Sequence, residues 1–257
     1  MGRFYLHQNL DRNPSETLQG FIGELLDQFR GYPFDTMRPV ATYSAEVNVN
    51  WKNFMEIFQE CYHVAHIHEG SVAEIGTGKD NPFGHLLSVR LYRRHRSASV
   101  YYNPEHNPTA AETLAFKHGP TILQGTAAEK ELPRGLNPER SPKWGFDINA
   151  IFPNFILDLA DGSYWTLHYW PIAVDRTSWE VTLYMEAPAN AGEKISQEFS
   201  KVLMRDAFRE NLSRLENIQA NMASGALTHT PLSDQEIVVR HAYKVVEDMV
   251  GRPAQTA

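Results

Sequence analysis

The stretch NAIFPNFILDLADGSYWTLHYWPIAVDRTSWEVTLYMEA, residues 149–187, decides the fold. It is rich in aromatic and β-branched residues, which are typical of strands. Within it, the pair Asp161-Gly162 is typical of a tight turn between antiparallel strands. The stretch therefore predicts three successive antiparallel strands, at residues 149–160, 163–174 and 179–187.

Helical patterns frame this meander of strands. Residues 193–222 predict a long helix that ends at Ser224-Gly225, and residues 233–249 predict a last helix. Long helices packed on an antiparallel sheet indicate an α+β helix-grip, or START-like, fold, and we expect a single domain over residues 1–257. Earlier in the chain, the patterns predict strands at 3–10, 42–51, 86–93 and 97–102, helices at 14–30, 54–65 and 108–118, and a loop at 70–85.

The composition excludes several classes of protein. With 42% hydrophobic and 21% charged residues, the chain of 257 residues is expected to be globular rather than disordered. Its formal net charge of -7 argues against nucleic acid as a partner, because phosphate binding needs a basic surface. No apolar run predicts a membrane span and no secretory signal is present, so we expect a cytoplasmic protein. The single cysteine, Cys61, excludes an internal disulfide and an iron–sulfur cluster held by protein cysteines.

Three histidines lie close together in NWKNFMEIFQECYHVAHIH, residues 50–68. Imidazoles bind zinc, copper, iron and nickel, and two of them with one carboxylate form the facial triad of non-haem iron oxygenases. Glu60 precedes the first histidine by one helical turn, from where it could hydrogen-bond an imidazole and fix its tautomer. The spacing alone does not distinguish iron from zinc, and it also fits ordinary histidines at a helix end. The three are His63, His66 and His68.

The same segment resembles the signature of the catalytic domain in the α (large) subunit of Rieske non-haem iron aromatic-ring-hydroxylating oxygenases. In that family a strand ends in Asn-Trp-Lys, here residues 50–52, and an acidic helix follows. Tyr-His comes next, here Tyr62-His63, and a second histidine lies five positions on, here His68. The likeness is collinear elsewhere, in GRFYLHQNLD (2–11), PSETLQGFIGELLDQF (14–29), the strands at 148–185 and LENIQANMASGA (215–226).

This resemblance implies an enzyme that inserts oxygen from O₂ into a small aromatic or other apolar substrate, as a mono- or dioxygenase. It implies that His63 and His68 bind Fe²⁺. It also implies catalytic roles for Asn50 and for Glu60, which falls where the family has an acid that bridges a neighbouring subunit's Rieske cluster and the iron. Four aromatic residues are candidates for the wall of the substrate pocket or, equally, for the core: Phe54, Phe58, Phe83 and Phe155.

The Rieske domain of that family has no counterpart in this sequence, because the Cys-x-His and Cys-x-x-His pairs that bind its cluster do not occur. The chain is then either a piece of a longer polypeptide or a stand-alone catalytic domain. We expect its electrons to come from an external Rieske or ferredoxin protein. In the family, electrons pass between subunits, so the resemblance implies an oligomer, either a homotrimer or an α/β hetero-oligomer.

The third iron ligand of the family is an aspartate, and by the resemblance its place is taken by Asn211, eight residues before Gln219. Apolar residues at helical spacing around Asn211 predict that its side chain faces inward. An amide oxygen is neutral and lacks the charge that a carboxylate offers to Fe²⁺. The apolar residues are Phe208, Leu212, Leu215 and Ile218.

Several alternatives remain open from the sequence. The third ligand could instead be Asp206, Glu210, His66 or water, with Asn211 an ordinary buried and hydrogen-bonded amide. The domain could be a catalytically degenerate ligand-binding module or partner subunit, since it lacks both a Rieske domain and the expected aspartate. It could also be a metal-dependent lyase or hydrolase that needs no electrons. Metal content separates these hypotheses.

Overall fold

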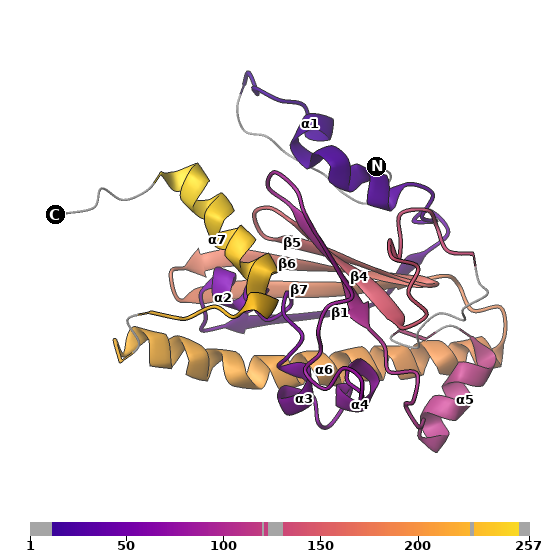
Figure 1. The fold of residues 1–257 in the computed structure, drawn as a ribbon. Helices are drawn as coiled ribbons and strands as arrows, with labels where there is room; N and C mark the ends of the chain where they lie inside the picture. Colours follow the sequence, from indigo (N-terminus) through magenta and orange to yellow (C-terminus); the bar gives the residue numbers. More distant parts are fainter. Residues whose placement is uncertain (1–11, 120, 123–130, 227–228, 252–257) are drawn as a thin grey trace.

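A seven-stranded antiparallel sheet forms the centre of the molecule (Figure 1). The structure, a computed structural model, describes residues 12–119, 121–122, 131–226 and 229–251, so the strand predicted at 3–10 lies outside the described residues. The strand order is β1-β7-β6-β5-β4-β3-β2. The bounds are β1 Arg38–Val47, β2 Ser88–Leu91, β3 Arg96–Tyr101, β4 Trp144–Ile151, β5 Phe155–Ala160, β6 Ser163–Ala173 and β7 Arg176–Met185.

The central meander contains one strand more than the sequence predicts. Residues 149–160 were expected to form a single strand, but β4 and β5 are separated by a turn at 152–154. Pro153 has no N–H with which to continue the ladder, so the chain reverses there. Asn154 fixes the reversal by donating its side-chain amide to the carbonyl of Tyr169 at 2.7 Å. The turn predicted at Asp161-Gly162 is confirmed, and Gly162 supplies its left-handed conformation with φ of 73°.

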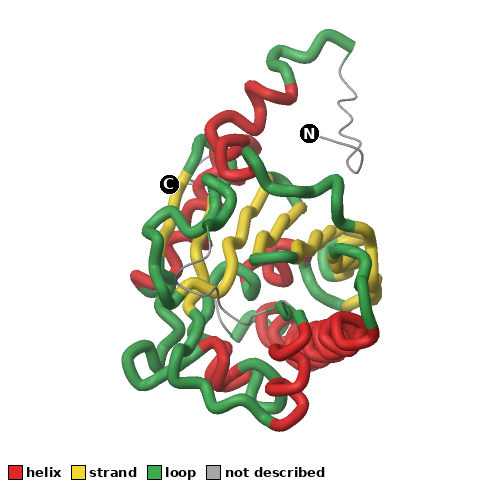
Figure 2. The backbone as a smooth tube through the Cα atoms, turned by 90° about the vertical axis from the view of Figure 1, so that its right-hand side faces the viewer, coloured by secondary structure: helices red, strands yellow, loops and turns green. Residues whose placement is uncertain are grey.

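Helices cover the faces of the sheet. In Figure 1 the long helix α6 runs below the sheet, and Figure 2, turned by 90°, shows it nearly end-on. The α+β helix-grip prediction is confirmed, as are the predicted long C-terminal helices and the helix at 108–118. The helices are α1 Leu18–Ile22, α2 Trp51–Glu56, α3 Val64–Ile67, α4 Ala73–Gly76, α5 Ala110–His118, α6 Ala191–Ala223 and α7 Ile237–Val250, with 3-10 helices at Gly23–Phe29 and Asp234–Glu236.

The helix predicted at 54–65 is wrong as a continuous element. The chain instead forms α2, a turn, and α3. The helix ends because the N–H of Phe58 bonds the carbonyl of Met55, three residues back, which tightens the last turn. The N–H of His63 then bonds the carboxylate of Glu60 at 3.3 Å instead of a helical carbonyl. The Glu60 side chain thus accepts a backbone N–H that would bond a carbonyl oxygen in a continuous helix, and the helix is interrupted there.

Smaller differences separate the predicted and observed elements. The predicted loop at 70–85 contains the short helix α4, and about half of the helix predicted at 14–30 is a 3-10 helix. Gly84 adopts a φ of 58°, and a Cβ there would lie 2.4 Å from the carbonyl oxygen of Cys61. Only glycine therefore lets this loop pack against the segment that carries the histidines.

The largest apolar core lies between the sheet and α6. Trp179 of β7 is 1% exposed and packs against Phe54 of α2 and Phe208 of α6, with ring centroids 5.6 Å and 5.1 Å apart. This aromatic contact fixes α2 and α6 on the same face of the sheet. The candidate site lies beside this contact, between the segment that follows α2 and the part of α6 around Phe208 and Asn211.

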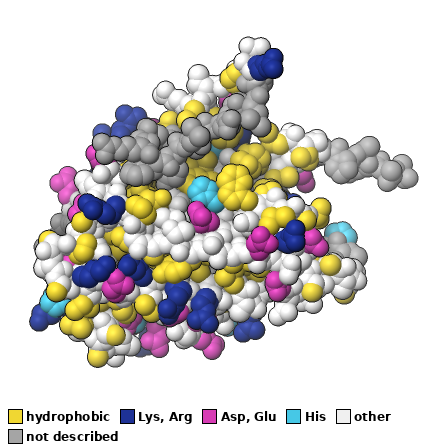
Figure 3. Space-filling view, turned by 180° about the vertical axis from the view of Figure 1, so that it is seen from behind, with side chains coloured by type: hydrophobic (Ala, Val, Ile, Leu, Met, Phe, Trp, Pro, Cys, Tyr) yellow, Lys and Arg dark blue, Asp and Glu magenta, His cyan; other side chains and the backbone are white. Residues whose placement is uncertain are grey.

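The surface carries charges of both signs. On the face shown in Figure 3, basic and acidic side chains are intermixed. Many are paired, as in the ion pair between Arg205 and Asp206 at 2.9 Å. Among the described residues, no helix has the length and apolar character that crossing a membrane requires.

Candidate active site

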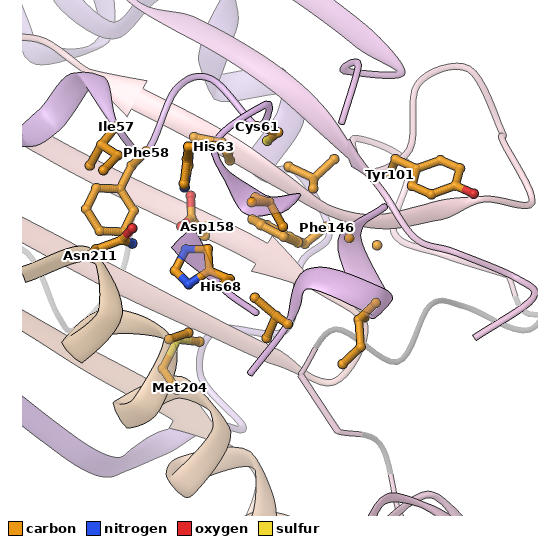
Figure 4. Close-up of a pocket in the computed structure, with 18 of the residues that line it drawn as sticks. Ile57, Phe58, Cys61, His63, His68, Tyr101, Phe146, Asp158, Met204 and Asn211 are labelled. Carbon is orange, nitrogen blue, oxygen red and sulfur yellow. The ribbon is translucent and has the colours of Figure 1, made fainter. Parts of the chain in front are cut away.

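A cavity of about 120 Å³ lies between the sheet, α6 and the segment from α2 to α4 (Figure 4). Its wall is mainly apolar, and the predicted site residues Glu60, His63, His68 and Asn211 all belong to it. The segment from α2 to α4 contributes Ile57, Phe58, Glu60, Cys61, His63, Val64, His68, Val72, Ile75 and Gly76. The sheet and its loops contribute Val100, Tyr101, Tyr102, Gly145, Phe146, Ile148, Asp158 and Trp165, and α6 contributes Met204, Ala207, Phe208 and Asn211.

His63 is oriented by Glu60. Its Nδ1 lies 2.7 Å from Glu60 Oε1, and the second carboxylate oxygen accepts its backbone N–H. Both side chains are largely buried, with 11% and 9% of their surface exposed. A carboxylate on Nδ1 fixes the tautomer and leaves Nε2 free to bind a metal or a ligand.

His68 is oriented by Glu210, which comes from α6. Its Nδ1 lies 2.8 Å from Glu210 Oε2, and the same oxygen accepts the hydroxyl of Ser71. The two imidazoles therefore carry the same arrangement on one side, each with a carboxylate on Nδ1. Their ring centroids lie 5.3 Å apart.

Asn211 faces the pocket from α6, as predicted, and is 4% exposed. Its Oδ1 is buried and, among the described residues, makes no hydrogen bond of normal distance and angle, although the Asn211 side chain lies close enough to His68 to oppose the lowering of that imidazole's pKa. The inward stripe of α6 consists of Met204, Phe208, Asn211 and Leu215, whereas Ile218, predicted to belong to it, is 39% exposed. The role of Asn211, as a metal ligand or as an ordinary buried amide, stays a prediction.

The other candidates for a third ligand lie elsewhere. Asp206 forms an ion pair with Arg205 outside the pocket. His66 is exposed and does not line the pocket. Glu210 contacts Nδ1 of His68. It therefore orients the imidazole rather than replacing it as a ligand.

Asn50 does not reach the pocket, contrary to the catalytic role expected for it. It is the N-cap of α2, and its Oδ1 accepts the N–H of Lys52 at 3.0 Å. Its Nδ2 donates to the carbonyl of Val174 at 2.5 Å, and its backbone N–H donates to Gln219 at 2.8 Å. The side chain is thus occupied in joining α2 to α6 and to the turn between β6 and β7.

Of the four aromatic residues proposed for the wall, only Phe58 lines the pocket. Phe54 is part of the core, and Phe83 is 61% exposed. Phe155 packs against His168, with ring centroids 4.7 Å apart. Helical or strand spacing alone could not separate these roles, because it does not say which apolar face borders a cavity.

The pocket changes the acid–base behaviour of its groups. Burial lowers the pKa of His68, and the hydrogen bond to Glu210 opposes this change. The neutral imidazole, which is the form that binds metals, is therefore favoured. Burial also raises the pKa of the Cys61 thiol well above its usual range, so this cysteine stays protonated.

These donors fit a divalent metal ion of modest affinity. Two imidazoles of one pocket have Nδ1 held by a carboxylate, which leaves Nε2 as the metal-binding nitrogen, and Oδ1 of Asn211 is an oxygen donor on the adjacent helix. Within the described ranges, His, Cys, Asp and Glu residues form no group of three that could hold a metal. The third protein donor on offer is therefore a neutral amide, which stabilises Fe²⁺ less than a carboxylate does.

The comparisons with known proteins agree with this geometry. The sequence profile of the ring-hydroxylating alpha subunit (catalytic domain) matches residues 34–252. The chain therefore belongs to the family of ring-hydroxylating oxygenase alpha-subunit catalytic domains. No curated protein sequence matches the chain.

Solved structures share the fold at low sequence identity. A quaternary ammonium Rieske monooxygenase, CntA, in complex with an inhibitor, superposes with a TM-score of 0.61 at 14% identity, covering 93% of this chain and 57% of that one. Naphthalene 1,2-dioxygenase from Rhodococcus sp. bound to indole gives 0.60 at 14% identity, with 93% and 63% covered. NdmA from Pseudomonas putida CBB5 with caffeine gives 0.54 at 11%, with 84% and 53% covered. The chain thus spans little more than half the length of these relatives.

Two features of the site were not predicted from the sequence. Glu210 was considered only as a ligand, and its contact with His68 joins residues 142 positions apart. Asp158 stands in an apolar strand and lines the pocket. An acid inside FILDLA was the available signal, because a charged residue in a buried strand is rare and points to a specific role.

Proposed function

We propose that the chain is a non-haem iron oxygenase domain that acts on a small apolar or aromatic substrate. One observation carries the proposal: two imidazoles that line one apolar pocket each have Nδ1 held by a carboxylate, which directs Nε2 as the metal-binding nitrogen. Membership of the ring-hydroxylating family favours iron and O₂ over a lyase or hydrolase reaction. His63, His68 and Asn211 would hold Fe²⁺, with Asn211 in the place of the family's aspartate.

When bound, Fe²⁺ would supply the activation of O₂ that protein side chains cannot perform. The residues of this chain perform the other tasks. Glu60 and Glu210 hold the imidazoles in one tautomer and orientation. The apolar wall, which includes Phe58 and Phe208, binds the substrate and excludes water from it.

The electrons would come from a centre outside these 257 residues, because Cys61 is their single cysteine and cannot build a cluster. We propose a Rieske or ferredoxin protein as donor, with Glu60 on the route to the iron. We also propose that the chain assembles, as a homotrimer or with a second type of subunit. Light scattering of the purified protein tests this, and a monomer at high concentration contradicts it.

The test of function is isotope incorporation. The protein is loaded with Fe²⁺ without oxygen, supplied with a flavin reductase, NADH and a Rieske-type ferredoxin, and exposed to ¹⁸O₂ with a panel of single-ring aromatics. We expect ¹⁸O in a hydroxylated product, and no product when the ferredoxin is omitted. Equal product with the reductase alone contradicts the proposed route of electrons.

A second candidate function has one observation in its favour. Asn211 weakens the metal site, so a degenerate domain that binds a ligand without oxidising it would keep the same pocket. In that case the apolar probes bind, but Fe²⁺ does not bind at stoichiometric amounts. Iron titration therefore separates the two functions without an activity assay.

A further inference from the structure

Asp158 is a carboxyl group in the apolar wall of the pocket. It lies on β5, between Ile148 of β4 and Trp165 of β6, and all three line the cavity. The residue is 3% exposed. Figure 4 shows it on the strand side of the pocket, whereas Met204 and Asn211 come from the helix.

One oxygen of this carboxyl group has no partner. Among the described residues, Oδ1 of Asp158 is buried without a hydrogen bond, and the side chain of Trp165 provides a hydrogen bond that stabilises the charged form. Burial raises the pKa of Asp158 well above its usual range. An unpaired buried polar group costs stability and requires an explanation, such as a ligand that supplies the missing partner.

The metal site does not explain Asp158. The pocket wall contains two acids, and Glu60 is engaged with His63 while Asp158 is not. Within the part of the chain that the structure describes, Asp158 also forms no metal-binding group with the two histidines. Among the described residues, its Oδ1 is therefore left without a partner in the wall of the cavity.

The size of the cavity limits the ligand. Its volume of about 120 Å³ is close to that of engineered apolar cavities, of about 150 Å³, which bind benzene. A single six-membered ring fills such a space. Most of the wall suits the ring itself, since Ile148, Val100 and Phe208 offer only apolar contacts.

We propose that the pocket selects a single-ring substrate that already carries a hydroxyl group, and that this hydroxyl bonds Oδ1 of Asp158. A hydroxyl both donates and accepts, so it satisfies the carboxyl group in either protonation state. A hydrocarbon would leave Oδ1 unpaired. The proposal rests on the pocket being the substrate site of the proposed oxygenase, and it makes Asp158 a residue that determines specificity.

Phenol and toluene provide the matched pair of probes, because they differ by a hydroxyl in place of a methyl group of similar size. Their dissociation constants are measured by calorimetry on the purified protein, with chelator present so that iron plays no part. We expect phenol to bind about tenfold more tightly than toluene, the effect of one hydrogen bond to a buried partner.

Three variants locate the preference. Asp158→Leu keeps the branched outline of the side chain, at a larger volume, and removes both oxygens, so it should bind the two probes equally. Asp158→Asn, which nearly keeps the volume, should retain part of the preference. Asp175→Asn, in the exposed turn between β6 and β7, is the control and should retain all of it. Circular dichroism and thermal melting check that each variant folds, and we expect Asp158→Leu to be at least as stable as the wild type because an unpaired buried group is removed.

The wild-type protein alone can overturn the proposal, whatever the variants do. Equal affinity for phenol and toluene contradicts it, and so does a preference that persists in Asp158→Leu. In addition, the carboxyl ¹³C resonance of Asp158 should shift with phenol and not with toluene. Since no iron is present, a preference for phenol combined with absent iron binding would reject the oxygenase function and keep the role of Asp158.

Discussion

The two histidines of the pocket have the same arrangement, but the sequence encodes it in two different ways. His63 is held by Glu60, three residues earlier in the same turn. His68 is held by Glu210, which lies 142 positions away on α6 and has 25% of its side chain exposed. One half of the site is thus local, and the other half forms only when α6 packs against the segment that carries the histidines.

This difference has a consequence for stability and function. Glu60 also accepts the backbone N–H of His63, so it determines the path of the chain as well as the imidazole. The described hydrogen bonds of the Glu210 carboxylate are with two side chains, those of His68 and Ser71. Losing Glu60 should therefore affect folding and metal binding together, while losing Glu210 should affect metal binding alone.

The largest effect is expected from removing either imidazole. His63→Ala and His68→Ala should each abolish iron loading, because each removes one of three protein donors. His66→Ala is the matched control, since His66 is exposed outside the pocket, and it should load like the wild type. Iron is measured by mass spectrometry after anaerobic loading. Full iron content in either pocket variant would reject the site.

A gain is expected from Asn211→Asp. It introduces a carboxylate at nearly constant volume where the unpaired Oδ1 now lies, and it should raise the affinity for Fe²⁺ by about 100-fold, since changes beside a ligand already shift affinity by about 10–100-fold. Competition with a chelator measures the two affinities. Equal or weaker binding in the variant, or a loss of stability from an unpaired buried acid, would show that Asn211 is not at the ligand position.

Glu60→Ala and Glu210→Ala test the difference between the two carboxylates. Each should lower the affinity for Fe²⁺ by about 10–100-fold, because the imidazole loses its orienting partner. Only Glu60→Ala should also lower the free energy of unfolding, by about 1–3 kcal/mol, because it leaves a buried N–H unpaired. Denaturant unfolding and chelator competition measure both effects. Unchanged metal affinity in Glu210→Ala would mean that His68 needs no partner.

A second acid of the segment that carries the histidines, Glu56, provides the smallest expected effect, which concerns the pH dependence of stability. Burial raises its pKa to about 7, and a hydrogen bond from Tyr243 opposes this rise. Because the folded pKa lies above the unfolded value, the stability that this group contributes is complete below about pH 4.5 and is lost as the pH rises through 7. Glu56→Gln should thus match the wild type at pH 4.5 and exceed it by about 1–3 kcal/mol at pH 8. A constant difference between the two pH values in urea unfolding would contradict this.

The sequence allowed the sheet, the long helices and the inward orientation of Asn211 to be predicted, because each depends on periodicity within one element. It also allowed His63, His68 and Glu60 to be proposed together, since they lie within nine residues. The break between α2 and α3 was missed because it depends on a tightened turn at Phe58 and on the Glu60 side chain, which accepts the N–H of His63, and not on a residue of low helix propensity. The contact of Glu210 and the position of Asp158 depend on the packing of α6 and on the register of β5, which no local pattern reports.

The most direct test of the account is an anaerobic titration of the wild-type protein with Fe²⁺, followed by metal analysis at saturation. We expect about one iron per chain, bound reversibly and lost on dialysis because His63, His68 and Asn211 are all neutral donors. Absence of bound iron at the end of the titration, or stoichiometric zinc that iron does not displace, would contradict the proposed iron site.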